Sequence, residues 1–358
     1  MINDNFYQFL LIRRFYILQG SSLNINPDLY DHYQDKVILI TGGTGSIGSQ
    51  IVMELVKYSP KKIIIYSKDD SKQYLMKKRM KEFNNIYYIL GDIRDFQRVE
   101  YVSRGVDYIF HTAALKQVPI CEENPDEAIK TNLLGSLNII EAAINNGVKK
   151  VINISTDKAV NPTNTMGVTK LLAEKLFKQA NLKLNNHHTK FSSVRFGNVL
   201  GSRGSVFPLL FEQLMNQEPL TITDLGMTRF FMSIKEAVLL TIKAGAYAEG
   251  EEIYILKMKA LMLSDLVVGL KEYSKQKQVK EPEVQIIGIR QGEKLYEELV
   301  LESELENLYE NEEMYVISPN SPDTTLFKKL YLSDYRSDKV NLITQKEVLQ
   351  ILKDLDRT

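Results

Sequence analysis

Short runs of β-branched and other apolar residues alternate, early in the chain, with longer segments in which apolar positions recur at helical spacing. The short runs predict buried strands, and the longer segments predict amphipathic helices. Strands are expected at residues 36–40, 62–66, 86–90, 108–112, 150–155 and 191–196. Because strands and helices alternate, we predict an α/β fold in which a doubly wound parallel sheet carries helices on both faces. Ligands should bind at the carboxyl ends of the strands.

The regular alternation ends near residue 197. Beyond it, glycines and prolines separate short predicted helices, and one further strand is expected near residues 252–256. This looser pattern predicts a smaller α/β lobe at residues 198–358, mainly for substrate binding and partly interleaved with the sheet domain at residues 36–197. Residues 1–35 form an N-terminal extension with a helix and an arm. A cleft is expected between the two lobes.

Charge and cysteine content exclude several classes of partner. The chain has 45 basic and 45 acidic residues, whereas a nucleic-acid-binding protein is expected to be basic. Cys121 is the only cysteine, so one chain forms neither a disulfide nor a thiolate metal site, and a cytoplasmic location fits best. We expect Cys121 to be a small buried apolar residue. No metal site is predicted, since His111, His187 and His188 show no metal-ligand spacing with acidic residues.

Residues 6–18 are the one N-terminal stretch that resembles a membrane element. The stretch is shorter than the roughly 20 residues that span a bilayer, and Arg13 and Arg14 lie in its middle. We therefore predict no membrane span. An amphipathic helix is expected here, packed on its own protein or on a neighbouring subunit.

The first expected strand runs directly into the sequence TGGTGSIG at residues 41–48, and a predicted helix follows. Glycines permit a tight turn that approaches a pyrophosphate closely, and a helix N-terminus offers it free N–H groups. In this context the motif predicts a Rossmann-type site, so residues 36–197 form the dinucleotide-binding domain. The residues expected to contact the cofactor are Gly42, Thr44, Gly45, Ser46, Ile47 and Gly48.

The end of the second strand bears on the choice of cofactor. Folds that bind NAD usually place an acid there, on the ribose 2′-hydroxyl, but this strand ends in Ser67 and Lys68, followed by Asp69. We favour NADP because Lys68 can pair with a 2′-phosphate, and NAD is the alternative because Asp69 can reach the ribose. After the third strand, Asp92 and Ile93 are placed to bind adenine, although Asp92 can equally serve a cap or turn.

The candidate chemistry follows the fifth strand. The strand runs into Thr156, Asp157 and Lys158, and a predicted helix then begins with Met166 and Lys170 on one face, four positions apart. On that face a lysine can bind the nicotinamide ribose beside the residue that handles the substrate hydroxyl.

Six motifs carry a family resemblance: ALKQVP (114–119), ENPDEAIKTN (123–132), TDKAVNPTN (156–164), RFGNVLGSRGS (195–205), TRFFM (228–232) and QGEKLYE (291–297). In this order they resemble the polysaccharide-biosynthesis branch of the extended short-chain dehydrogenase/reductase family, over about residues 36–300. The best-defined members of that branch are UDP-N-acetylglucosamine 4,6-dehydratases.

The resemblance implies a dehydration in which the sugar is oxidised at C4, loses its C5 proton and C6 hydroxyl, and receives the hydride back at C6. It assigns Asp157 as the acid at the C6 oxygen, Lys158 as the base at C5 and Thr156 to the O4 region. The lysine must be neutral and the carboxyl protonated at the working moment. We expect burial to favour these neutral forms in a pair that titrates as a unit.

Met166 departs from the pattern, since most relatives have a catalytic tyrosine there and a thioether transfers no proton. Some dehydratases of the branch are similar in carrying methionine, so the change alone does not make the protein inactive. The O4 proton then needs another acceptor. The candidates are Lys170, Asp157 acting through Thr156, or a water-linked Lys158.

The remaining motifs resemble a UDP-sugar binding site. A guanidinium suits a diphosphate, and amides or carboxylates suit nucleoside edges and hydroxyls. The expected substrate contacts are Lys116, Asn198, Arg203, Arg229 and Glu293. Further cofactor contacts are expected at Ala113, Ala114, Lys116, Asn132 and Lys170. Asn132 can also stabilise a water or a helix kink. A homo-oligomer, dimer or hexamer, is expected.

The leading hypothesis is therefore a UDP-N-acetylglucosamine 4,6-dehydratase. A nucleotide-sugar 4-epimerase or reductase is the alternative enzyme, but simple epimerisation does not require the acid and base that Asp157 and Lys158 supply. An inactive cofactor-binding relative is a third hypothesis, suggested by Met166.

Overall fold

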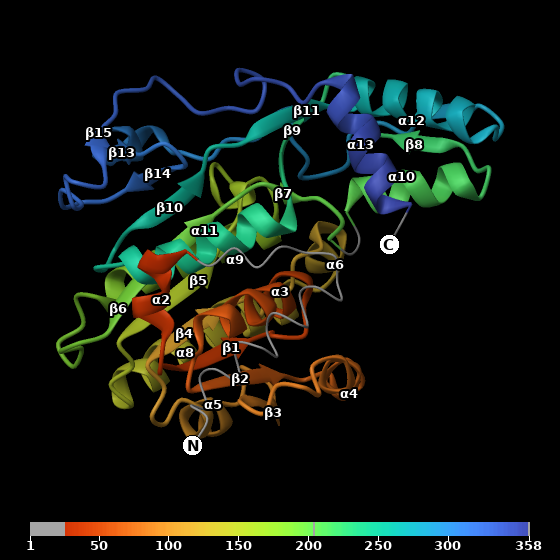
Figure 1. The fold of residues 1–358 in the computed structure, drawn as a ribbon. Coiled ribbons are helices and arrows are strands. Elements are labelled where there is room, and N and C mark those ends of the chain that lie inside the picture. Colours follow the sequence, from red (N-terminus) through yellow and green to blue (C-terminus); the bar gives the residue numbers. More distant parts are fainter. Residues whose placement is uncertain (1–25, 203–204, 357–358) are drawn as a thin grey trace.

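A large sheet runs through the computed structural model, which describes residues 26–202 and 205–356 (Figure 1). Its ten strands lie in the order β15-β13-β14-β10-β6-β5-β4-β1-β2-β3. From β3 across to β10 the strands are parallel, and β14, β13 and β15 are added antiparallel at the edge. The bounds are β1 Val37–Thr41, β2 Lys62–Ser67, β3 Ile86–Leu90, β4 Tyr108–His111, β5 Lys150–Ile154, β6 Lys190–Arg195, β10 Ile253–Leu256, β13 Leu308–Glu310, β14 Met314–Ile317 and β15 Lys328–Lys329.

The six strands expected early in the chain are all present, and the doubly wound α/β fold is confirmed. The order β3-β2-β1-β4-β5-β6 is that of a Rossmann-type sheet, whose switch point lies between β1 and β4. The strand expected at residues 252–256 is β10, which continues the large sheet beside β6, although the sequence pattern placed it in the smaller lobe. Its residues Tyr254 and Ile255, which point to opposite faces, are both buried there.

Helices cover both faces of the large sheet, as Figure 1 shows. One face packs against a core shared by α2 Pro27–Tyr33, α3 Ser46–Leu55, the 3₁₀ turn η1 Val56–Tyr58 and α11 Ile234–Tyr247. The other face packs against α5 Phe96–Val102, α8 Gly135–Asn145 and α9 Thr165–Ala180. Helix α4 Asp70–Arg79 lies beside β3 at the edge.

A smaller group of elements has its own apolar core beyond the carboxyl end of the sheet. It contains the sheets β11-β9-β7 and β12-β8. The bounds are β7 Asn198–Val199, β8 Leu220–Ile222, β9 Thr228–Met232, β11 Lys259–Met262, β12 Val284–Ile286, α10 Val206–Met215, α12 Leu263–Lys277 and α13 Gln345–Leu355. Helices α12 and α13 pack so closely that a Cβ on Gly269 would lie 2.5 Å from Val348.

Short helical turns line the carboxyl ends of the central strands. After β4 come α6 Val118–Glu123, α7 Pro125–Ala128 and a π-helical turn, η2 Ile129–Leu134; after β5 comes the 3₁₀ turn η3 Asp157–Ala159. The turn η4 Glu302–Asn307 precedes β13. π-Helical turns are rare and occur often at functional sites.

The N-terminal extension is described only from residue 26 onward, so the helix expected at residues 6–18 lies outside the described residues. Helix α2 begins after Asn26, whose side chain accepts from the Asp28 N–H at 2.9 Å. It buries Leu29 and Tyr33, and the Tyr33 hydroxyl donates to the Ile242 carbonyl of α11 at 2.5 Å. The end of the extension is therefore part of the main core.

Candidate active site

The glycine-rich turn joins β1 to α3 at the switch point of the sheet. Gly42 has φ +64°, and a Cβ there would lie 2.8 Å from the Ala113 backbone. A Cβ on Gly48 would lie 2.5 Å from the Gly42 carbonyl oxygen. Helix α3 begins at Ser46, and its N-cap Gly45 provides no side-chain hydrogen bond. The N-cap therefore makes no side-chain hydrogen bond that would compete with a phosphate for the backbone N–H groups of the first turn.

The end of β2 lies next to this turn. The Thr44 hydroxyl donates to Ser67 Oγ at 3.2 Å, and Gln73 Nε2 donates to the same oxygen at 3.1 Å. Asp69, the acid predicted to reach a ribose, serves as the N-cap of α4 and accepts from the Lys72 N–H at 2.8 Å. Ile47 packs against the adjoining core. The bonds to Ser67 connect the glycine-rich turn and α4 at the carboxyl end of β2, where the predicted cofactor residues lie.

Lys68 and Asp92 carry opposite charges at this edge. Lys68 is 61% exposed and its Nζ lies 3.9 Å from Asp92 Oδ2. Although partial burial disfavours the charged carboxylate, hydrogen bonds from Arg94 and the charge of Lys68 lower the pKa of Asp92. Ile93 is buried against Gly135, and its carbonyl accepts from Asn138 at 2.9 Å. Lys68 is thus the most accessible cation of this group.

Thr156, Asp157 and Lys158 form one hydrogen-bonded group just beyond β5. Asp157 Oδ1 accepts from the Thr156 hydroxyl at 2.8 Å and from Lys158 Nζ at 3.0 Å. The Asp157 side chain is fully buried and that of Lys158 is 22% exposed. The backbone of this group is held by the segment after β6, because the Asp157 N–H donates to the Phe196 carbonyl at 3.1 Å. The predicted acid and base are therefore in direct contact.

The smaller lobe adds three residues around Lys158. Asn198 Oδ1 accepts from Lys158 Nζ at 3.3 Å, and Glu297 Oε1 lies 3.7 Å from the same nitrogen. Arg229 Nε lies 3.8 Å from Glu297 Oε1. Asn198 and Arg229 were predicted to contact substrate, whereas Glu297 was missed. The only sequence signal for it was its place at the end of the QGEKLYE motif.

The charges of this cluster correct one expectation. Burial disfavours a charged lysine, but Asp157 and Glu297 outweigh that effect and raise the pKa of Lys158. Burial, opposed by the charge of Lys158, raises the pKa of Glu297. We expected burial to make the lysine neutral. Two nearby carboxylates stabilise the ammonium instead, a through-space effect that the sequence pattern did not reveal.

Met166 and Lys170 share the buried face of α9, as their spacing predicted. Met166 packs in a small apolar cluster with Cys121 and Ala128, and Cys121 is fully buried, as predicted. Lys170 Nζ donates to the Ile154 carbonyl at the end of β5. Burial lowers the pKa of Lys170 to about 8. A thioether accepts no proton, so of these two residues only Lys170, with its lowered pKa, can serve as a proton acceptor.

Asn132 lies in the π-helical turn η2 and holds the segment after β4. Its Oδ1 accepts from the Leu115 N–H at 2.8 Å, and its Nδ2 donates to the Leu115 carbonyl at 3.0 Å and to Thr169 Oγ1 at 3.1 Å. Asn132 therefore connects this segment to α9. The predicted residues Ala114 and Lys116, on either side of Leu115, are exposed.

Glu293 lies on the loop of the QGEKLYE motif, and its Oε2 accepts from the Arg290 N–H at 3.1 Å. The loop sits against the segment before α9, because the Gly292 carbonyl accepts from Asn164 at 3.0 Å and Lys294 Nζ donates to the Val160 carbonyl at 2.7 Å. Of the predicted substrate contacts, Arg203 lies outside the described residues.

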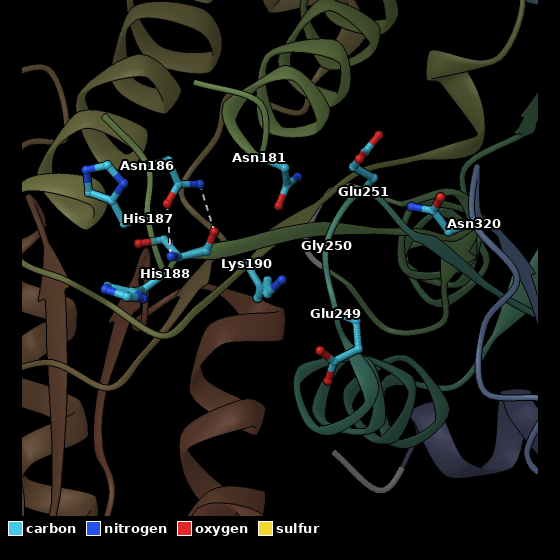
Figure 2. Close-up of a pocket in the computed structure, with 10 residues that line it drawn as sticks. Asn181, Asn186, His187, His188, Lys190, Glu249, Gly250, Glu251 and Asn320 are labelled. Carbon is cyan, nitrogen blue, oxygen red and sulfur yellow. Dashed lines mark hydrogen bonds between the residues drawn. The ribbon is translucent and has the colours of Figure 1, made fainter. Parts of the chain in front are cut away.

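A separate pocket of about 210 Å³ opens beside the amino end of β6, opposite to the cluster around Asp157 (Figure 2). Asn186 and Thr189 pair there through two hydrogen bonds of 2.9 Å, and Asn181 donates to the Phe191 carbonyl at 2.9 Å. Asn181 and Asn186 thus stabilise a loop. Within residues 26–202 and 205–356, no three His, Cys, Asp or Glu side chains are arranged to hold a metal ion.

The family described as polysaccharide biosynthesis protein matches residues 38–319 of the chain. The chain belongs to this family. The resemblance inferred from the six motifs is therefore confirmed.

Three relatives have similar sequence identity to this protein but are named for different functions. An uncharacterised membrane protein of Methanocaldococcus jannaschii is 46% identical, over 92% of this chain and 98% of its own. An inverting UDP-N-acetylglucosamine 4,6-dehydratase of Campylobacter jejuni is 44% identical, over 80% and 84%. A UDP-glucose 4-epimerase of Rickettsia felis is 39% identical, over 90% and 97%.

A solved structure, Pen from Bacillus thuringiensis, is similar to this protein over almost its whole chain. It has a TM-score of 0.86 and 40% identity, and covers 91% of this chain and 99% of its own. Among the described residues, no helix is long and apolar enough to cross a membrane.

Proposed function

We propose that the protein is a nucleotide-sugar 4,6-dehydratase that converts UDP-N-acetylglucosamine to a UDP-4-keto-6-deoxy sugar. The observation that carries this proposal is the hydrogen-bonded group of Thr156, Asp157 and Lys158 beyond β5. It offers an acid and a base together, as an elimination requires. The relative named as such a dehydratase supports the same activity.

The cofactor of this proposal is a nicotinamide dinucleotide held by the turn from Gly42 to Gly48. The turn fits a pyrophosphate, because any side chain at Gly42 or Gly48 would strike backbone atoms, and α3 points its N-terminus there. Such a cofactor accepts a hydride from the sugar and returns it. Lys68 is exposed beside Asp92 and suits a 2′-phosphate, so we propose NADP, with NAD as the alternative.

The residues of the chain move the protons of the reaction. The Thr156 hydroxyl already donates to Asp157, so it can take the O4 proton while passing its own proton to the carboxylate. Asp157 is thereby protonated and can expel the C6 hydroxyl as water. Lys158 removes the C5 proton from its deprotonated form, which the raised pKa makes the minor form at rest. Lys158 later returns that proton to C5. Protons balance in this sequence, and Met166 has no part in it.

Lys170 is the second candidate for the O4 proton. Its pKa, lowered by burial to about 8, makes the neutral amine accessible near neutral pH. Its Nζ bonds the Ile154 carbonyl, however, whereas Thr156 bonds the proposed acid directly. We therefore favour the path through Thr156. In this proposal the protein acts in the cytoplasm as a homo-oligomer, as the sequence predicted.

A nucleotide-sugar 4-epimerase is the second candidate function, because a relative at 39% identity carries that name. Epimerisation needs a hydride transfer at C4 but no base at C5. An epimerase would therefore have no catalytic use for the paired acid and base, Asp157 and Lys158.

Proton NMR of the product formed in deuterated water tests the proposal. We expect UDP-N-acetylglucosamine to yield a 4-keto-6-deoxy sugar with deuterium at C5, because Lys158 exchanges its proton with solvent. A C4 epimer that keeps all its hydroxyls would establish the second function. An unchanged sugar with bound cofactor would identify an inactive relative.

A further inference from the structure

Glu297 reaches the Asp157 and Lys158 pair from the smaller lobe. Its N–H donates to Ser337 Oγ at 2.9 Å, and its carbonyl accepts from the Ser337 N–H at 2.9 Å. Ser337 is fully buried, and its hydroxyl also lies 2.8 Å from Thr228 Oγ1 on β9. The backbone of Glu297 is thus fixed on both sides, which directs its carboxylate toward Lys158.

The contacts of Glu297 differ from those of a structural ion pair in the same protein. Arg195 is fully buried and makes charge-assisted hydrogen bonds of 2.6–3.1 Å with both oxygens of Glu174 and of Glu304. Glu297 instead lies 3.7 Å from Lys158 Nζ. Within the described residues, Glu297 Oε2 and Asp157 Oδ2 are buried without a hydrogen-bond partner. Buried polar atoms without a hydrogen-bond partner are rare in folded proteins.

We propose that Glu297 is a positioning residue that, together with Asp157 and Asn198, holds Lys158 and sets the proton affinity of its amine. An ammonium has three donors. Two of them are used by Asp157 Oδ1 at 3.0 Å and Asn198 Oδ1 at 3.3 Å, and Glu297 Oε1 lies 3.7 Å from the same nitrogen. Nothing in the sequence motifs assigns this role to Glu297.

The role follows from the charges that face the two groups. Asp157, Glu297 and Arg229 surround Lys158, while Lys158, Asp157, Arg229 and Lys294 act on Glu297. A carboxylate beside Lys158 stabilises the ammonium that forms when the amine takes a proton from carbon. In the proposed dehydratase this makes Lys158 a stronger base at C5, and this kinetic consequence alone rests on the proposed function.

Titration of Lys158 in the full-length protein tests the inference without reference to activity. The side chain is followed by NMR of ¹³Cε-labelled lysine and assigned by its loss in Lys158→Ala. We expect Glu297→Gln to lower the pKa of Lys158 by about one unit, the size of effect that a charge at this distance produces. Glu297→Asp, which keeps the charge but shortens the side chain, should lower it less.

Glu298→Gln, at the next position in the chain, is the matched control. Glu298 Oε2 accepts from Asn161 Nδ2 at 3.0 Å, and no hydrogen bond or ion pair joins Glu298 to Lys158 among the described residues. We expect it to leave the pKa of Lys158 unchanged. An unchanged pKa in Glu297→Gln would overturn the inference. Loss of folding in both Glu297 variants, with Glu298→Gln intact, would also overturn it by assigning Glu297 a structural role.

Kinetics provide a second arm. In Glu297→Gln the acid limb of the kcat profile should move down by about one pH unit, and KM should change by less than about twofold, because the loss affects the base rather than binding. A wild-type protein that forms no 4-keto sugar would refute the proposed function and leave the NMR result to decide the role of Glu297.

Discussion

Three consecutive side chains, Thr156, Asp157 and Lys158, each take a different place in the proposed reaction. Thr156 and Lys158 both donate to the same oxygen, Asp157 Oδ1, so one carboxylate is linked to the proposed O4 relay and to the C5 base. The order of proton transfers can therefore be tested by removing one partner at a time.

At the residue scale, we predict that Thr156→Val and Lys158→Ala stop the reaction at different points. Thr156→Val removes the hydroxyl that takes the O4 proton, so C4 oxidation should slow by about 10²-fold or more. Lys158→Ala should still oxidise C4 but lose dehydration, so nicotinamide absorbance should show reduced cofactor accumulating. Both variants should bind the nucleotide sugar. Full turnover by Lys158→Ala would remove Lys158 from the mechanism.

At the scale of elements, a buried ion-pair network ties the site to its supports. Arg195 ends β6, Glu174 lies on α9 one turn beyond Lys170, and Glu304 belongs to η4. The Leu299 carbonyl also accepts from Arg195 at 2.8 Å. The network therefore connects the sheet, the helix that carries Lys170 and the segment that follows Glu297. Arg195 belongs to a motif of the family but here has a structural role.

We predict that Arg195→Met destabilises the protein by about 3–5 kcal/mol, because it leaves two carboxylates in a buried site without their partner. Chemical denaturation measures the change. Arg195→Lys, which keeps the charge but loses the planar fork, should cost less. The control Lys259→Met removes a half-exposed partner of Glu347 and should cost less than about 1 kcal/mol. Equal losses for both Met variants would contradict the argument.

At the scale of the whole molecule, the site is assembled from both parts of the chain. The sheet domain supplies Asp157 and Lys158, and later segments supply Asn198, Arg229 and Glu297. The later part of the chain also contributes β10 and β14, which belong to the large sheet. Because the later chain is anchored in the sheet, the parts of the site are fixed relative to one another. Packing of the later segments on the sheet domain thus changes the pKa of Lys158 in that domain.

The pH dependence of stability is a property of this shared core, and His111 contributes to one window of it. His111 is buried between Thr41 on β1 and Ser136 on α8, at 2.8 and 3.2 Å. Burial, helped by the charge of Lys170, lowers the pKa of His111 to about 3. The unfolded chain binds a proton below about pH 6.5 and the folded chain does not, so stability is lost as pH falls from 6.5 toward 3.

We predict that His111→Asn removes this window. The wild type should lose up to about 1.4 kcal/mol per pH unit from this group below pH 6.5, and the variant should lose that much less. At pH 7 and above the variant should be the less stable protein, because it gives up one of two buried hydrogen bonds. Denaturation from pH 4 to 8 measures both. Parallel curves for the two proteins would show that His111 does not titrate in this way.

The sequence predicted the parts of the fold and site that are local. The runs at residues 36–40 and 108–112 became β1 and β4 because their apolar pattern is a property of the strand itself. Strands β13, β14 and β15 were not predicted, because each is short and finds its partner only through antiparallel pairing at the sheet edge.

The sequence by itself determined the strand, turn and helix at Gly42 to Gly48 and the succession of Thr156, Asp157 and Lys158, because neighbouring residues fix both geometries. Only the tertiary structure decided the charge of that lysine. Glu297 is remote from Lys158 in the chain and comes within 3.7 Å of it only when the later segments pack on the sheet. Electrostatic energy depends on distance through space rather than along the chain, so folding set what the motif could not.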